Sequence, residues 1–322
     1  MSQMMNMDST FQYKTLFGPV PSRRLGISLG VDLVPHKTCS LDCVYCESGA
    51  TTHLTLKRKE YVSVERIKDE LRRYLSSNEK IDYVTFSGSG EPTLNEGIGE
   101  IIQFLKADYP AHKIALLTNS TLFDQPLVRR QVKDADVVMA SLDAATKDRF
   151  KQINRPHPNL DLNRIVAGLT AFAKGFAGRL LLEYFIVKDG NDQLGDLQRI
   201  KTMFAQIDAD GILLNTLDRP APEAWVQPVE TDRLQTISDF LENTEVVTYS
   251  TQQPVAMAQH GDLTERLVET IRRRPYTVLD VSQIMGVNVE ALQPVLDRLV
   301  ASKELAVKQM DRGIFYTAAS AI

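Results

Sequence analysis

The chain gathers its cysteines in one short stretch. Cys39, Cys43 and Cys46 are the three cysteines of the 322-residue sequence and are spaced as C-x-x-x-C-x-x-C. Iron prefers soft thiolate ligands, and three thiolates on one loop can hold three corners of an iron–sulfur cube. The fourth iron would then stay open to a small molecule, so the spacing favours a cluster that takes part in a reaction. Three buried apolar cysteines, or a zinc site with a distant fourth ligand, also fit the cysteines alone.

A glycine-rich turn, FSGSGEP at residues 86–92, offers a second set of ligand contacts. Gly88 and Gly90 allow the backbone to approach a ligand closely, and the Glu91 carboxylate suits an ammonium group. We therefore expect Ser87, Gly88, Gly90 and Glu91 to contact a cofactor. The alternative is an ordinary tight turn, because Gly-x-Gly-Glu is a common sequence.

Polar residues also end three later apolar runs, where a buried strand would not need them. They are Asn119, the pair Ser141 and Asp143, and the pair Asn215 and Arg219. The Asn119 amide could hold a ligand or close a turn. Ser141 and Asp143 could together reach the hydroxyls of a sugar, or cap a helix that starts near Thr146.

Apolar runs alternate with segments of helical period through most of the chain. The runs are 83–87, 113–118, 136–141, 179–187 and 211–216, after a first strand at 27–33. The helical segments are one from Ser63 to about 75, then 96–107, 125–133, 146–152, 162–174, 192–206 and 231–243. Buried strands that alternate with helices predict an α/β fold with a parallel sheet, either open and doubly wound or closed as a partial barrel. In both folds ligands bind at the carboxyl ends of the strands, and the cysteine loop follows the first strand at that edge.

The two ends of the chain depart from this pattern. Residues 1–16 are predicted to form a flexible polar lead, and residues 17–24, with two prolines, are predicted as a turn. The polar stretch 251–262 predicts a linker. Over 263–322, three short helices followed by a hairpin at 305–317 predict a winged-helix domain. The third helix is expected to begin near Ala291, which would put Pro294 in its first turn.

Composition and charge exclude several classes of protein. The sequence is 43% hydrophobic and carries a net charge of −4, so it has no overall attraction to nucleic acid or anionic membranes. It has no apolar run long enough to cross a bilayer and no signal peptide at its start, which predicts a cytoplasmic protein. Residues 263–322 carry eight basic and seven acidic side chains, and Glu290 and Asp297 lie on the third predicted helix. This is no strong DNA-binding signal.

The motifs resemble those of the radical S-adenosylmethionine enzymes. The cysteine triad with Tyr45 between its last two members is similar to their cluster motif. The turn 86–92 resembles their glycine–glycine–glutamate motif, with Ser89 in place of the middle glycine, and Ser141 with Asp143 matches the polar pair after their fourth strand.

This resemblance covers roughly residues 17–250. The stretch from Phe17 to Cys46 further resembles a subgroup of iron–sulfur oxidoreductases related to 4-demethylwyosine synthase. That enzyme uses a second cluster, for which this chain has no further cysteines.

The resemblance implies a partial (β/α)6 barrel with a 4Fe–4S cluster on the three cysteines. S-adenosylmethionine would bind the open iron, and an electron from an external donor of the flavodoxin or ferredoxin type would release a 5′-deoxyadenosyl radical that abstracts a substrate hydrogen. Glu91 would accept the amino group, and Ser141 with Asp143 would hold the ribose. The other expected cofactor contacts are Tyr45 and Asn215 beside the adenine, with Ser87, Gly88, Gly90 and Asn119.

The sequence leaves the substrate open between three hypotheses. The leading one is an RNA-related or phosphorylated substrate, possible examples being tRNA or a compound held by Arg23 and Arg24, although these arginines could be surface charge only. The second is a peptide or protein docked by the winged helix, and the third is a redox-sensing DNA-binding regulator. Glu183 and Lys188 could touch the cofactor or the substrate, but we interpret them as solvated strand-end charges. The cluster 272–274 is interpreted as a solvated helix end.

Overall fold

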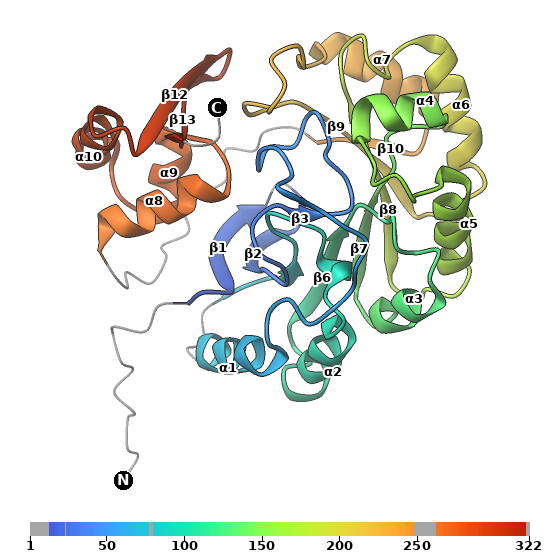
Figure 1. Cartoon of the computed structure of the whole chain (residues 1–322), viewed down its shortest axis with the longest axis horizontal. Coiled ribbons are helices and arrows are strands. Elements are labelled where there is room, and N and C mark those ends of the chain that lie inside the picture. The colour runs from blue at the N-terminus through green and yellow to red at the C-terminus, as the bar shows by residue number, and fades with distance from the viewer. Residues whose placement is uncertain (1–12, 23, 77–79, 248–261, 320–322) are drawn as a thin grey trace.

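The computed structural model describes residues 13–22, 24–76, 80–247 and 262–319 (Figure 1). Most of the predicted N-terminal lead and of the predicted linker lies outside these residues. Among the helices of the described part, none is long and apolar enough to cross a membrane.

An eight-stranded sheet forms the centre of the larger part of the chain, in the order β1-β2-β5-β6-β7-β8-β9-β10. All described neighbours from β2 to β10 are parallel, whereas β1 runs antiparallel to β2. The strands are β1 Leu16–Ser22, β2 Gly26–Val31, β5 Tyr83–Phe86, β6 Lys113–Thr118, β7 Val137–Ser141, β8 Arg179–Ile186, β9 Gly211–Thr216 and β10 Thr244–Val246. The predicted parallel sheet is confirmed.

Helices lie around the outside of this sheet (Figure 1). They are α1 Val64–Leu75, α2 Ile98–Asp108, α3 Pro126–Val132, α4 Lys147–Arg149, α5 Leu162–Ala173, α6 Leu194–Phe204 and α7 Thr231–Leu241, with short turns of 3-10 helix at Pro92–Leu94 and π-helix at Phe150–Asn154. The Ser63 side chain caps α1 as predicted, and Ile67 and Leu71 on the apolar face of this helix are fully buried. Strand, crossover helix and parallel strand repeat along the chain, which is consistent with a partial TIM-like barrel.

Two strands differ from the sequence predictions. The predicted turn over 17–24 is wrong, because residues 16–22 form β1. Proline is tolerated there because β1 is an edge strand, and its register with β2 shifts between Phe17 and Val20. Strand β10 was not predicted. It has only three residues, and it is a strand because these residues pair with β9.

The C-terminal unit has its own apolar core and the predicted helices and hairpin. Its elements are α8 Leu263–Arg273, β11 Tyr276–Thr277, α9 Val278–Met285, α10 Val289–Ala301, β12 Leu305–Met310 and β13 Gly313–Ala318. The three strands form a sheet in the order β11-β13-β12. The predicted start of the third helix near Ala291 is wrong, because α10 begins two residues earlier, at Val289, where the Asn288 side chain caps it by accepting a hydrogen bond from the Ala291 backbone. Pro294 therefore lies in the helix interior rather than in its first turn.

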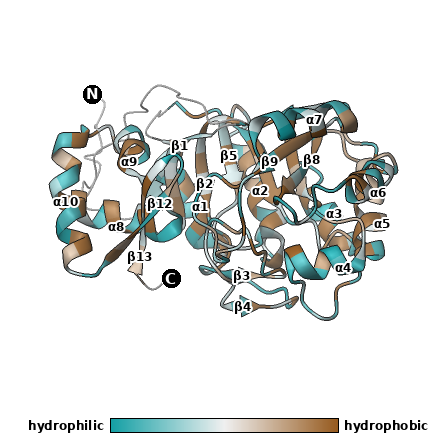
Figure 2. Cartoon of the chain, turned by 90° about the horizontal axis from the view of Figure 1, so that it is seen from above, coloured by the Kyte–Doolittle hydropathy of each residue, from teal (hydrophilic) through white to brown (hydrophobic). Residues whose placement is uncertain are grey.

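The C-terminal unit packs against the first strands of the large sheet. Val20 of β1 contacts its core, and Arg273 at the end of α8 forms an ion pair with Asp32. Figure 2 shows α8, α9 and the hairpin beside β1 and β2, at the end of the molecule opposite to α5 and α6. At the tip of β12, Met310 packs against an apolar cluster that includes Val44, Phe185 and Leu217 and that also packs against Tyr45. The unit thus reaches from the edge of the sheet to the apolar cluster beside the cysteine loop.

Candidate active site

The three cysteines lie on one loop after β2, and each sulfur faces one side-chain nitrogen. These contacts are Asn119 Nδ2 to Cys39 Sγ at 3.4 Å, Asn154 Nδ2 to Cys43 Sγ at 3.5 Å and Lys37 Nζ to Cys46 Sγ at 3.0 Å. All three cysteines are partly exposed. Each cysteine sulfur is thus oriented by a different side chain.

The geometry of the loop argues against a mononuclear zinc site. Within the described residues, no three His, Cys, Asp or Glu side chains converge on a single metal ion. Burial raises the pKa of Cys39 to about 12 and that of Cys43 well above its ordinary value. Burial therefore disfavours the thiolate form of both residues.

Glu91 joins the glycine turn to the neighbouring strand β6. Its Oε1 accepts hydrogen bonds from the backbone and hydroxyl of Thr93 and from the Thr118 hydroxyl, while Oε2 accepts from the Asn119 backbone. Oε2 thus retains acceptor capacity for a further donor. Burial raises the pKa of Glu91, and the hydrogen bonds oppose this shift.

The glycine turn lies directly against the cysteine loop. A Cβ atom at Gly90 would stand 2.3 Å from the Thr38 carbonyl oxygen, so this position must be glycine for the two segments to pack. Lys37 donates its backbone hydrogen to the Ser89 carbonyl at 2.6 Å. Gly88 has φ +127° and, like Ser87, borders a cavity. The turn therefore positions the cysteine loop as well as facing open space.

Asp143 is a buried hub rather than an open ligand. Its carboxylate accepts hydrogen bonds from the Tyr45 hydroxyl, from Asn154 Nδ2 at 2.7 Å and from the Phe185 backbone at 2.9 Å. Burial raises the pKa of Asp143 to about 6, against the effect of these bonds. Tyr45 stacks on the Phe185 ring at 3.8 Å between centroids. Asp143 thus holds the aromatic residue of the cysteine loop against β8.

Ser141 and Asn215 meet at a residue interpreted from the sequence as a solvated charge. Glu183 of β8 accepts hydrogen bonds from Ser141 Oγ at 3.3 Å and from Asn215 Nδ2 at 3.2 Å, and it forms an ion pair with Arg24. The Glu183 side chain is only 16% exposed, so that interpretation is wrong. For Lys188 it is right, since this side chain is 42% exposed and pairs with Glu230. Strands β7, β8 and β9 thus bring three polar groups together at one end of the sheet, where Arg24 from the turn between β1 and β2 joins them.

The family model of the radical SAM superfamily matches residues 33–194, which contain the cysteine loop, the glycine turn and Asp143. The chain belongs to the radical SAM superfamily. A UPF0026 protein of Helicobacter pylori strain J99 is 32% identical over 308 residues, which cover 94% of this chain and 97% of that protein. A Brachyspira hyodysenteriae protein named GTPase Obg is 32% identical over 299 residues, which cover 91% of this chain but only 44% of that protein.

The fold has a counterpart among solved structures. A radical SAM methyltransferase from Sphaerobacter thermophilus superposes with a TM-score of 0.57 at 16% sequence identity, over 70% of this chain and 67% of that one. This similarity concerns the fold alone.

A radical SAM enzyme uses a 4Fe–4S cluster and S-adenosylmethionine, and the cysteine loop fits the cluster. In a cube each cysteine binds a different iron, so the sulfurs need not converge on one point. Three sulfurs on one loop, each with its own N–H donor, are compatible with such binding. Lys37 and Asn154 were not predicted from the sequence, and only the short separation of Lys37 from Cys39 could have suggested one of them.

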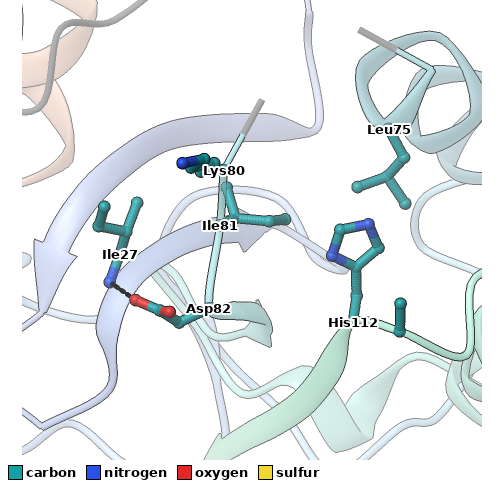
Figure 3. A pocket seen from close by; sticks show the side chains of 7 residues that line it. Ile27, Leu75, Lys80, Ile81, Asp82 and His112 are labelled. Atoms are coloured by element: carbon teal, nitrogen blue, oxygen red, sulfur yellow. Dashed lines mark hydrogen bonds between the residues drawn. The ribbon is translucent and has the colours of Figure 1, made fainter. Parts of the chain in front are cut away.

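A second cavity lies at the opposite ends of the strands (Figure 3). It has a volume of about 490 Å³ and is lined by Ile27 at the start of β2, His112 just before β6, and Asp82, which accepts a hydrogen bond from the Ile27 backbone at 2.7 Å. Barrels of this kind place their chemistry at the carboxyl ends of the strands. The cysteine loop lies at that other edge, so this cavity is not part of the candidate active site.

Proposed function

We propose that the chain is a radical SAM enzyme that abstracts a hydrogen atom from an RNA-related or phosphorylated substrate. Cys39, Cys43 and Cys46 would hold one 4Fe–4S cluster, which when bound supplies the electron that cleaves S-adenosylmethionine. The observation that carries this proposal is the loop in which each cysteine sulfur has its own nitrogen donor, beside polar groups at the strand ends.

The described residues support distinct tasks at the cofactor site. The free acceptor capacity of Glu91 Oε2 suits an ammonium group beside the glycine turn. Ser141 and Asn215, with Glu183 between them, form a hydroxyl-binding set for a ribose. The satisfied carboxylate of Asp143 would instead position Tyr45, which differs from the direct ribose contact expected from the sequence.

The remaining expected contacts fit around these tasks. Ser87 and Gly88 lie on the same glycine turn as Glu91 and would contact the cofactor from there, whereas Gly90 and Asn119 mainly hold the cysteine loop. Radical SAM enzymes need an external reductant, and we propose a donor of the flavodoxin or ferredoxin type. Electron entry is compatible with the partial exposure of the cysteines.

We also propose a division of the chain into a flexible lead (1–16), a radical SAM partial barrel (17–250), a linker (251–262) and a winged-helix domain (263–322). The three helices and three-stranded sheet of the C-terminal unit support the last assignment. Its third helix exposes Glu290 and Asp297, which would repel phosphates in a DNA groove. A redox-sensing DNA-binding regulator is therefore disfavoured on electrostatic grounds.

A peptide or protein substrate is the second candidate. The observation that favours it is the half-exposed apolar pair Val307 and Ile314 on the C-terminal hairpin, at 48% and 50% exposure. Profiling of both the proteome and the small-molecule and RNA fractions of a deletion strain separates the two candidates, because the unmodified substrate accumulates in one fraction only.

The test of the radical chemistry uses anaerobically reconstituted protein and a strong reductant. The wild type should convert S-adenosylmethionine to 5′-deoxyadenosine, and Cys43→Ala should not. Ala50→Ser, at an exposed position of the same loop, should retain the wild-type rate. Equal product from wild type and Cys43→Ala would exclude the cluster assignment.

A further inference from the structure

A cavity of about 220 Å³ lies between the barrel and the C-terminal unit. On the barrel side it is lined by Arg24, Arg219 and the glycine turn at 87–89. On the other side, Arg273 and Arg274 at the end of α8 line it. The predicted solvated helix end is therefore wrong for these two arginines, although Arg272 is exposed.

Most of the charged residues that line this cavity are arginines. Four arginines and a single acid, Asp280, line it. Three of the guanidiniums form ion pairs with carboxylates that are not among the lining residues, namely Arg24 with Glu183, Arg219 with Glu47 and Arg273 with Asp32. Arg219 also pairs with Asp280 of the lining, at 3.4 Å. The acids outside the lining hold the arginines in place from outside the cavity, so a bound anion meets donors that are already oriented.

Aromatic rings fix the same guanidiniums further. Arg219 and Arg274 lie over the Tyr276 ring at 4.6 and 5.3 Å from its centroid, and Arg273 lies over Phe17 at 4.5 Å. Arg274 donates to the Tyr276 hydroxyl through Nε at 2.7 Å and has no ion pair with a described residue. Arg219 is fully engaged by protein groups, since its Nε faces the Glu47 carboxylate at 3.3 Å and its Nη1 donates to the Pro275 carbonyl at 2.6 Å. Donor capacity is thus left over on the Nη groups of Arg274.

We propose that this cavity binds the phosphate group of a small organic substrate. Planar guanidiniums match the oxygens of a phosphate in pairs, and their charge offsets the dianion. The volume is below the range of drug-sized pockets, which begins at roughly 300 Å³, and therefore suits a compound about the size of a sugar phosphate rather than a nucleic-acid strand. This inference rests on the proposed function, since the glycine turn that borders the cavity also borders the cofactor site.

The experiment measures binding to the full-length, reconstituted protein by calorimetry. The probes are ribose 5-phosphate and inorganic pyrophosphate, with ribose as the uncharged match. Both phosphates should bind and ribose should not. Arg274→Gln should weaken phosphate binding about tenfold, the loss expected for one charge-assisted hydrogen bond.

Two further variants separate a binding defect from a folding defect. Gln283 lines the cavity and has no hydrogen-bond partner among the described residues, so Gln283→Glu adds a negative charge without removing a contact. It should weaken phosphate binding at least about tenfold. Arg272→Gln removes an exposed arginine of the same helix and should bind both phosphates as the wild type does.

The inference is overturned if neither phosphate binds the wild type, or if all four proteins bind equally well. Binding of tRNA that is lost in Arg272→Gln and kept in Arg274→Gln would place phosphate recognition on the outer surface and would equally overturn it. Formation of 5′-deoxyadenosine is measured separately. Cleavage of S-adenosylmethionine without phosphate binding refutes only the cavity, and phosphate binding without cleavage refutes only the proposed radical function.

Discussion

The nitrogen donors beside the three cysteine sulfurs differ in charge. Asn119 and Asn154 present neutral amides, whereas Lys37 presents an ammonium group to Cys46. Burial lowers the pKa of Lys37, but the neighbouring cysteines outweigh this and raise it overall, so the side chain remains charged. Hydrogen bonds and positive charge near cluster sulfurs favour the reduced, more negative cluster.

Replacing Lys37 by methionine should therefore lower the reduction potential of the cluster. If the variant loses about 1 kcal/mol of stabilisation of the reduced cluster relative to the oxidised cluster, the reduction potential falls by on the order of 40 mV for a one-electron couple. An anaerobic redox titration followed by electron paramagnetic resonance measures this shift. Lys57→Met, at an exposed position further along the loop, is the control and should keep the wild-type potential. The same potential in both variants would contradict a role for Lys37.

The sequence identified the cysteines, the glycine turn and the polar strand ends, because their types and spacing are local features. It could not identify Asn154, which is 111 positions from Cys43 and reaches it only through the fold. It also misjudged Glu183, because the same charge is solvated at the end of a surface strand and buried inside a curved sheet. The sequence thus showed which residues belong to the site more reliably than it showed what each of them contacts.

The turn after β5 shows how a single backbone conformation can hold two elements together. At Gly88, φ is +127°, and a Cβ atom there would stand 1.9 Å from Asp32 Oδ1. Asp32 in turn pairs with Arg273 of α8. A side chain at Gly88 would therefore disturb both the turn and the docking of the C-terminal unit.

Gly88→Ala should lower the free energy of unfolding by about 2 kcal/mol, within the usual cost of one strained residue. Chemical denaturation of the apoprotein measures this change. Gly175→Ala provides the matched control, since a Cβ atom there meets nothing within 4 Å and its backbone conformation is an ordinary one. Equal stability of the two variants would show that the turn can relax freely.

Helix α10 contains a proline where a helix normally forms a hydrogen bond. Pro294 lies in its interior and is exposed, so the residue serves no visible packing purpose. Pro294→Ala restores the backbone donor and should stabilise the C-terminal unit by about 1 kcal/mol or more. A higher midpoint of thermal unfolding for the variant would bear this out, and a lower one would indicate that the proline fits its present place.

The sequence predicted the strands that are buried along their whole length, and it missed the strands that form only because they pair with a neighbouring strand. The five central strands are continuous apolar runs between helices, and their positions agree with the structure within a residue or two. Strand β1 escaped prediction because prolines are tolerated at an edge, and β10 because three residues carry too little pattern.

At the scale of the whole molecule, one buried carboxylate joins the barrel to the C-terminal unit. Asp280 of α9 is 4% exposed and pairs with Arg312 at 2.8 Å and with Arg219 at 3.4 Å. Burial raises the pKa of Asp280, but the hydrogen bonds and charges of these two arginines outweigh it and bring the pKa from 3.8 to about 2. The stabilisation is therefore complete above pH 4 and is lost as the pH falls towards 2.

Asp280→Asn should remove this dependence. The wild type should exceed the variant in stability at pH 5, and the excess should shrink by about 1 kcal/mol between pH 5 and pH 3. Denaturation of the apoprotein at the two pH values measures the difference. Asp297→Asn, exposed on α10, should follow the wild type at both. An excess that stays constant with pH would show that Asp280 titrates as it does in the unfolded chain.

The contact of Met310 with the apolar residues around Tyr45 has a thermodynamic consequence. The tip of the C-terminal hairpin packs against an apolar cluster that also contains Val44 of the cysteine loop, so ordering that loop and seating the hairpin share one apolar cluster. The two events are thermodynamically linked. If binding of the 4Fe–4S cluster stabilises the packing of the hairpin by some free energy, packing of the hairpin stabilises binding of the 4Fe–4S cluster by the same amount. The C-terminal unit is then linked to the cysteine loop, and retention of the 4Fe–4S cluster can report on its docking.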